Sequence, residues 1–345
     1  YVCWQTSTDT TSVVHYGPST ALGYTNQGEW QQLGANIIWH SVKIEGLTPQ
    51  TEYYYQIKTP EVETQIYKFQ TIPEHGYYGG HVRIALRSDC QTHWQTGIKI
   101  FNAHVAKMWE LYGDDLATEI DLIFTTGDIV GTGSNLPSYK TEYFQPLHPL
   151  SPYVPAMVSI GNHEAESPHY YNYMKYEDFA GPQGEAYYSF QIGRVLIIAL
   201  NSNSSWRNDT QIAWLAETLD DAQQDDRIDW IFTFCHHPGR SSVWTPGNTS
   251  YIQDRVIPLL AQTEKAELIA YGHSHNYERG AHPEATLRTM CVGGAAGNLD
   301  RWRDNNWTDY PEIQRSFDHH HFVVVDVDIA DRSYTIQTWS LGTPD

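Results

Sequence analysis

The chain has few basic residues. It carries only 21 lysines and arginines against 41 aspartates and glutamates, which gives a formal net charge of -20. A nucleic-acid partner requires basic surface that displaces counterions, so this balance argues against nucleic acid as a bound partner. The same charge would repel phosphate esters unless bound metal ions reversed its sign locally.

Cysteine is also scarce, and long apolar runs are absent from the sequence. Four cysteines, Cys3, Cys90, Cys235 and Cys291, are too few for a disulfide scaffold in a chain of 345 residues. Each lies in or beside an apolar run, so we expect buried free thiols. No apolar stretch reaches the roughly 20 residues that cross a bilayer, and we expect a soluble protein without a membrane partner.

Aromatic residues are abundant, and the sequence pattern changes near residue 80. Residues 1–72 contain short alternating segments at 13–17, 37–42 and 53–57, separated by turn residues and without helical periodicity. This pattern predicts a small all-β sandwich domain of the fibronectin III or immunoglobulin-like kind. The Gly- and Pro-containing stretch 73–80 is interpreted as a linker.

Residues 81–345 alternate strands with helices, which predicts an α/β sandwich as the second domain. One helix is expected from about 96 to 112, and a second begins at Asn208 or Asp209, either of which can cap it. The expected strands are 82–86, 122–125, 156–160, 195–200, 231–234, 268–271, 290–292 and 322–325.

Metal-binding side chains follow five of these strands. Ligands of open α/β sheets bind at the carboxyl ends of strands, so the residues just after each strand are the candidates. They are Asp89 and Gln91, Asp128, Asn162 with His163 and Glu164, His236 with His237, and His273 with His275. This mixture of carboxylate, amide and imidazole suits Fe, Zn or Mn, and the lack of thiolate clusters argues against a structural zinc site.

The five blocks, in this order, resemble the calcineurin-like metallophosphoesterase superfamily. The string Gly-His-Ser-His-Asn-Tyr-Glu-Arg at 272–279, the leading β-sandwich and the segment 311–327 resemble its purple acid phosphatase branch. The resemblance covers nearly the whole chain.

The resemblance implies two metal ions that share one carboxylate. Asp89, Asp128 and His275 would hold the first ion, and Asp128, Asn162, His236 and His273 the second. A hydroxide bridging two such ions is acidified and positioned for in-line attack on phosphorus. His163 would protonate the leaving oxygen or hold a phosphoryl oxygen, and Glu164 would orient His163.

Two positions depart from the family patterns. The purple branch places a metal-binding tyrosine three residues after the bridging aspartate, where this chain has Gly131. The wider superfamily places a histidine two residues after the first aspartate, where this chain has Gln91. We expect Gln91 to supply an amide oxygen to the first metal or to position a water. Without a tyrosinate the protein should not be purple.

Substrate contacts are harder to assign than metal ligands. His237, Arg240 and Tyr277 are candidates for substrate binding, although loop histidines and arginines are more often simply packed or solvated. Further candidates for contact with the substrate are His169, the run 319–321, and Trp94 with Trp244. For these residues too, a structural or solvated role stays open. Glu278 and Arg279 are expected to form a structural pair.

The favoured function is hydrolysis of small-molecule phosphate esters by a phosphomonoesterase resembling acid phosphatases, with two metal ions. The alternatives are a phosphodiesterase or nucleotide pyrophosphatase of the same fold, and a non-catalytic binding or adhesion protein with a degraded metal site. The resemblance, the acidic charge and a first residue other than Met favour an extracellular or periplasmic location. Oligomeric state, and glycosylation at Asn203, Asn208, Asn248 and Asn306, stay open.

Overall fold

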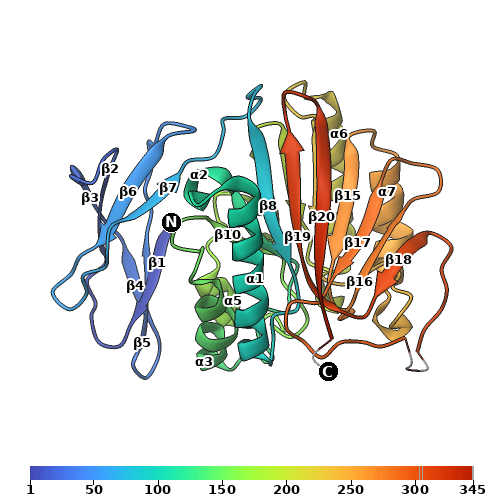
Figure 1. Ribbon diagram of the computed structural model, residues 1–345, viewed down its shortest axis with the longest axis horizontal. Coiled ribbons are helices and arrows are strands. Elements are labelled where there is room, and N and C mark those ends of the chain that lie inside the picture. The colour runs from blue at the N-terminus through green and yellow to red at the C-terminus, as the bar shows by residue number, and fades with distance from the viewer. Residues whose placement is uncertain (303, 305, 344–345) are drawn as a thin grey trace.

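The computed structural model describes residues 1–302, 304 and 306–343. Its first part is an all-β unit of two facing antiparallel sheets, with strand orders β1-β5-β4 and β3-β2-β6-β7 (Figure 1). The seven strands are β1 (Val2–Thr6), β2 (Val13–Gly17), β3 (Tyr24–Gln27), β4 (Glu29–Gly34), β5 (Ile37–Val42), β6 (Glu52–Ile57) and β7 (Tyr67–Gln70). The predicted β-sandwich is confirmed. The sequence analysis missed β1, β3, β4 and β7. The side chains of β3 and β4 are mostly polar and exposed, and those of β1 and β7 are only half-buried.

The β-sandwich has a small hydrophobic core of its own, and Trp39 joins it to the larger core of the second unit. Val14 and Val42 are fully buried inside the sandwich, whereas Trp39 of β5 packs outward. Its ring stacks on Phe144 at 5.3 Å and meets the edge of Tyr173 at 4.6 Å, both in the second unit. Burying an aromatic ring of this size contributes favourably to the free energy of folding. Packing of Trp39 against the second unit therefore holds the front unit in place.

The second unit is built on two facing sheets. The five-stranded sheet has the order β10-β9-β8-β19-β20 and the eight-stranded sheet the order β11-β12-β13-β14-β15-β17-β16-β18. The first contains β8 (His81–Arg87), β9 (Leu122–Thr125), β10 (Ala156–Val158), β19 (His320–Asp328) and β20 (Ser333–Gly342). The second contains β11 (Ala180–Gly181), β12 (Gly184–Ile192), β13 (Val195–Ala199), β14 (Trp230–Phe234), β15 (Ala266–Tyr271), β16 (Tyr277–Ala281), β17 (Arg288–Val292) and β18 (Ile313–Phe317).

Helices cover the outer faces of both sheets, so the unit is an α/β sandwich (Figure 1). Helix α1 lies on the five-stranded sheet, and α6 and α7 lie on the eight-stranded one. The α-helices are α1 (Trp94–Tyr112), α2 (Leu116–Glu119), α3 (Leu136–Ser138), α4 (Gln145–Leu147), α5 (Pro168–Tyr173), α6 (Asp209–Gln224) and α7 (Ile257–Ala261). Short helical segments are η1 (Tyr139–Phe144), η2 (Ser204–Trp206), η3 (Thr245–Gly247) and η4 (Tyr251–Val256).

The predicted strands and both predicted helices of this unit are present, with ends within three residues of those expected. Asn208 caps α6, since its side chain accepts the backbone N–H of Gln211 at 3.0 Å. The sequence analysis missed β11, β12, β16, β18 and β20. No residue of β18 or β20 is fully buried, and the exposed positions include the apolar Phe317 and Leu341, so burial and polarity do not match along these strands. The predicted linker 73–80 falls between β7 and β8; the domain boundaries themselves stay a prediction.

Parallel pairing brings the loops with the predicted metal ligands to one edge. Strands β8, β9 and β10 run parallel in one sheet, and β13, β14 and β15 run parallel in the other. The loops that leave β8, β9, β10, β14 and β15 carry all the predicted ligands. Carboxyl ends of parallel strands meet at the same edge of a sheet, which is why these separate loops converge.

All four cysteines are free thiols, with Cys90, Cys235 and Cys291 buried and Cys3 half-buried. Within the described residues, no helix has both the length and the apolar character to cross a membrane.

His104 of α1 is an ionisable group inside the core. It is 1% exposed, and its ring stacks on Phe322 of β19 with centroids 4.6 Å apart and an interplanar angle of 18°. Burial, with a smaller contribution from the charge of Arg87, lowers the pKa of His104 to about 3. The folded protein therefore keeps this imidazole neutral at pH values where the unfolded chain protonates it.

We predict that His104→Phe reduces the loss of stability in mild acid. Between the unfolded pKa of about 6.5 and the folded value of about 3, only the unfolded chain binds this proton, so stability falls as pH falls. From pH 7 to pH 5 the wild type should lose about 2 kcal/mol through this group, and His104→Phe should not. Urea unfolding followed by circular dichroism at both pH values measures the difference. The exposed His75, replaced by Phe, is the control; equal pH dependence of both variants would contradict the prediction.

Candidate metal centre

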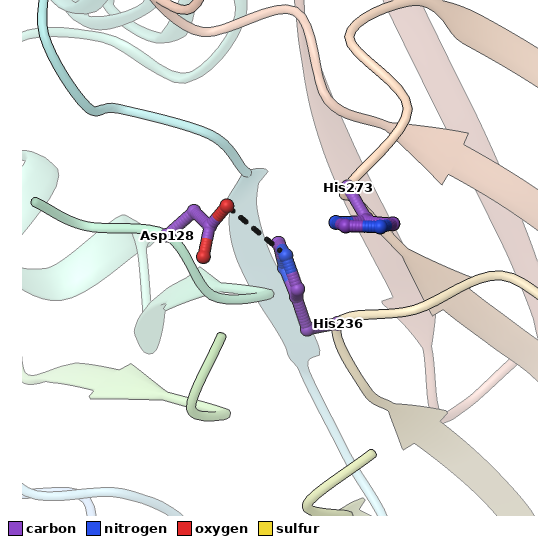
Figure 2. A group of neighbouring side chains, drawn as sticks. All are labelled: Asp128, His236 and His273. Carbon is purple, nitrogen blue, oxygen red and sulfur yellow. Dashed lines mark ion pairs between the residues drawn. The ribbon is translucent and has the colours of Figure 1, made fainter. Parts of the chain in front are cut away.

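Three side chains from three loops, two of them buried and one half-buried, meet at the edge where the sheets converge. Ligand atoms of Asp128, His236 and His273 all lie within 4.8 Å of one another. Figure 2 shows the Asp128 carboxylate facing the His236 ring, with His273 beside them. Asp128 Oδ2 is 3.1 Å from His236 Nε2, and these two residues are 1% and 0% exposed. One carboxylate and two imidazoles at this spacing form a donor set for a transition-metal ion.

Around these three, the remaining predicted ligands form a continuous group. Asn162 Oδ1 is 3.0 Å from His236 Nε2. His275 Nε2 is 3.3 Å from Asp89 Oδ1 and 3.0 Å from Gln91 Nε2, and Gln91 Nε2 is 3.4 Å from Asp128 Oδ2. The structure therefore brings all seven predicted ligand residues together, while their role as ligands stays a prediction.

The backbone of these loops is strained where it carries the ligands. Asp89, Asp128 and His273 have φ values of 59°, 50° and 67°, in the left-handed region that non-glycine residues rarely occupy. Such strain persists where surrounding contacts over-determine the conformation, and it is concentrated at functional sites. A Cβ atom on Gly161 would lie 2.2 Å from Asp128 Oδ1, so only glycine allows this close approach of the two loops.

The charges of the centre are arranged to attract cations. Burial opposes charge on His236 and His275, but the carboxylates of Asp128 and Asp89 outweigh it and raise both imidazole pKa values to about 9. Burial and the charge of His236 lower the pKa of His273 to about 3. The carboxylates thus hold protons on their neighbours, and metal ions replace protons of this kind when they bind. The donor set fits a metal centre, and so does the buried Gln91 Oε1, which has no hydrogen-bond partner among the described residues.

Glu164 has a different role from the one predicted. Its buried carboxylate accepts backbone N–H bonds from Asp128 at 3.0 Å, Ile129 at 2.9 Å, Val130 at 3.2 Å and Gly161 at 2.7 Å. It therefore joins the loops after β9 and β10. It does not orient the ring of His163, because its oxygens are directed at these backbone groups.

His163 is oriented by the loop that follows Asp128. Its Nδ1 lies 2.8 Å from the carbonyl oxygen of Gly131 and must donate to it, so Nδ1 carries a hydrogen. Its Nε2 is then directed toward the centre, 3.9 Å from Asp128 Oδ2. The side chain is 41% exposed, so it is accessible to a ligand.

The structure places only one of the three candidate substrate-binding residues beside the centre. His237 lies beside the centre, with its ring 4.2 Å from that of His273 and its Nδ1 2.9 Å from Ser202 Oγ. Arg240 instead pairs with Glu312. Tyr277 contacts Thr338 Oγ1 with its hydroxyl at 3.2 Å, because alternate residues of β16 face β20 and not the centre.

The predicted pair of Glu278 and Arg279 is wrong. As neighbours on one strand, they point to opposite faces. The Glu278 carboxylate accepts backbone N–H bonds from Ser242 and Val243. Trp244, by contrast, does flank the centre, with its ring 5.1 Å from that of His273.

Sequence analysis missed Glu142, which lies on η1. Its Oε2 accepts the backbone N–H of Gly131 at 2.7 Å and that of Thr92 at 2.9 Å. It thereby joins the loops after β8 and β9 and fixes the peptide that orients His163. A Cβ atom on Gly131 would lie 2.9 Å from Thr92 Cγ2 and 3.5 Å from Glu142 Oε2, so these residues fill the space beside position 131. No local motif marks Glu142, since its partners lie on distant loops.

The fold and this centre define an α/β sandwich protein of the metal-dependent phosphoesterase class, preceded by a β-sandwich. The chain belongs to the calcineurin-like phosphoesterase family, whose model matches residues 82–277. Residues 1–71 match the N-terminal domain of purple acid phosphatases. Both parts of the resemblance found in the sequence are thereby confirmed.

Individual relatives belong to the same group. Purple acid phosphatase 23 of Arabidopsis thaliana is 26% identical over 70% of this chain, and a probable inactive purple acid phosphatase 1 of the same plant is 23% identical over 57%. The chain spans 57% and 38% of their respective lengths. A purple acid phosphatase from yellow lupin seeds superposes with a TM-score of 0.70 at 16% identity, over 98% of this chain and 71% of that one. At that identity the likeness concerns the fold alone.

We predict that Glu142→Ala destabilises the protein and loosens the metal-binding loops. Loss of the carboxylate leaves two backbone N–H groups without their acceptor, which should lower the free energy of unfolding by roughly 2–4 kcal/mol. Urea unfolding measures this loss, and elemental analysis measures retained metal per chain. Glu142→Gln, which keeps one acceptor oxygen, should recover part of the stability. The control is Lys140→Ala on the same short helix; equal stability of both alanine variants would contradict this role.

Proposed function

We propose that the chain is a metal-dependent hydrolase of phosphate monoesters, similar in activity to acid phosphatases. The observation that carries the proposal is the cluster of Asp128, His236 and His273 at the strand ends of a calcineurin-like phosphoesterase fold. The exposed Nε2 of His163, 3.9 Å from Asp128 Oδ2, adds a proton-carrying group at its rim.

Two cations would be held by overlapping sets of residues. Asp89, Asp128, His275 and the oxygen of Gln91 would hold one, and Asp128, Asn162, His236 and His273 the other; Fe, Zn and Mn all suit these donors. When bound, such a pair supplies an acidified water and neutralises charge on the phosphoryl oxygens.

The protein's own contribution is orientation and proton transfer. Because Gly131 fixes Nδ1 of His163, the ring presents only Nε2 to a bound ester. When the ring is protonated on both nitrogens, Nε2 can donate a proton to the leaving oxygen or a hydrogen bond to a phosphoryl oxygen. Trp244 and His237 border the same space and would contact the organic part of the ester.

The second candidate is a binding protein with a degraded centre. Gly131 stands where the purple branch has a metal-binding tyrosine, and one curated relative bears the name of a probable inactive enzyme. This candidate predicts that neither metal nor turnover is found, so the same experiments distinguish the two.

Metal content is the first measurement. We expect elemental analysis of the purified full chain to give close to two ions of Fe, Zn or Mn. We expect turnover of para-nitrophenyl phosphate to exceed that of bis-para-nitrophenyl phosphate. The reverse preference would favour the phosphodiesterase alternative. Absence of both metal and turnover, even after reconstitution with metal, would favour the second candidate, a binding protein with a degraded centre.

His163 is tested apart from the metal. His163→Asn should lower kcat by roughly 10²- to 10⁴-fold, because a general acid or an oxyanion donor is lost, while metal content stays unchanged. His75→Asn, at an exposed histidine of the segment before β8, is the matched control. Full activity of His163→Asn would remove His163 from the reaction.

Gln91 is tested through metal stoichiometry. Gln91→Ala deletes the buried Oε1 that has no partner among the described residues, and it should lower metal content toward one ion per chain. Gln91→Glu, which retains an oxygen donor, should restore it. A Gln91→Ala protein with full metal content and activity would show that Gln91 is not part of the centre.

A further inference from the structure

A second cleft lies away from the metal-binding residues, between the two sheets. It has a volume of about 310 Å³ and is formed by β16 and β18 of the eight-stranded sheet, by β20 of the five-stranded sheet, and by the segment leading into β19 and its first residues. In Figure 1, β18 marks the edge of the eight-stranded sheet. The volume is at the lower end of the range for small-ligand sites, which is about 300–1,000 Å³. None of the seven predicted metal ligands lines it.

Two arginines in this cleft face each other across the strands. Arg279 of β16 and Arg315 of β18 are direct cross-strand partners in the antiparallel register, and both line the cleft. Like charges placed directly opposite each other destabilise a sheet. The fold therefore maintains an unfavourable pair of positive charges at one position.

The surrounding acidic residues do not neutralise this pair. Most other arginines in the described part of the chain pair with a carboxylate, as Arg194 does at 2.6 Å from Asp229, whereas Arg87 and Arg207 contact Cys90 and the carbonyl of Ser202 instead. Within residues 1–302, 304 and 306–343, neither Arg279 nor Arg315 forms an ion pair. The neighbouring Glu278 is directed to the opposite face and is bonded to backbone N–H groups there. Arg315 donates to the carbonyl oxygen of Gln314 at 2.8 Å. Both arginines are exposed in one cleft, so their positive charges are accessible to an external anion.

The wall beside the arginines is aromatic. Tyr277 and Phe317 are also cross-strand partners, and their rings stack at 6.2 Å with an interplanar angle of 19°. Phe317 is 47% exposed, and the ring of His319 lies over it at 6.1 Å. An exposed ring next to cationic groups offers a stacking surface for a planar ligand.

We propose that this cleft binds a small phosphate monoester that carries an aromatic ring. The guanidinium groups of Arg279 and Arg315 contact the phosphate, since two fixed positive charges match a dianion and each offers the planar fork that suits phosphate oxygens. The ring of the ligand packs on Phe317. A monoanion of the same shape would leave one guanidinium uncompensated and should bind more weakly.

The test uses the full chain as purified and a ligand that is not hydrolysed. Phenylphosphonate is titrated by calorimetry at about pH 8, where it is a dianion. The Asp128→Asn variant, whose metal centre is impaired, should still bind one equivalent. Arg279→Gln and Arg315→Gln, introduced into Asp128→Asn, should each weaken that binding at least tenfold. The matched control, Arg288→Gln, removes an arginine that pairs with Glu267 outside the cleft and should leave binding unchanged.

Two further ligands test separately the contribution of the second negative charge and that of the aromatic ring. Benzenesulfonate, a monoanion of nearly the same shape, should bind at least tenfold more weakly than phenylphosphonate, and so should methylphosphonate, which has no ring. Equal affinity for the sulfonate would overturn the dianion assignment. Binding that survives in the Arg279→Gln and Arg315→Gln double variant would overturn the site.

Because the two arginines are exposed, circular dichroism should show that the variants are folded. Arg279→Lys, which keeps the positive charge, should retain part of the affinity. Neither result depends on catalysis, so the proposed hydrolase activity stands or fails separately.

Discussion

The carboxylate of Glu164 is the contact on which the metal centre depends most. It is fully buried and accepts backbone N–H bonds from both the loop after β9 and the loop after β10. These loops carry Asp128 and Asn162, and the first of them is held in a strained conformation. A carboxylate with several N–H donors supplies the stabilisation that keeps such a backbone in place. Glu142 acts in the same way between the loops after β8 and β9, so two acidic side chains join three loops.

Charge is distributed unevenly over the molecule, and its two unusual regions have opposite sign. At the metal centre, buried carboxylates raise the pKa of neighbouring imidazoles, which is the behaviour of a site built for positive ions. In the cleft beside β18, Arg279 and Arg315 face each other without an acidic partner among the described residues, which is the behaviour of a site built for negative ions. In an otherwise acidic protein, both arrangements cost stability unless a ligand compensates them.

Family membership and function are separate questions for this chain. Relatives of this calcineurin-like phosphoesterase chain include one named as a purple acid phosphatase and one named as a probable inactive purple acid phosphatase. A fold positions strand ends, whereas activity depends on the side chains placed there. Here the donor residues converge, Gly131 leaves room for Thr92 and Glu142, and His163 presents one nitrogen outward. These are the features on which the proposed activity depends.

The sequence by itself determined the α/β architecture, the leading β-sandwich and the set of residues at the centre. Each of these is a local signal, a strand followed within a few residues by a loop with metal-binding side chains, such as Tyr271 followed by His273 and His275. Only the tertiary structure decided where Glu164 and Glu142 bind, that Tyr277 and Arg240 have other partners, and that Arg279 faces Arg315. The physical reason is that strand register and loop packing decide which face a side chain points to, and both are set by segments distant in sequence.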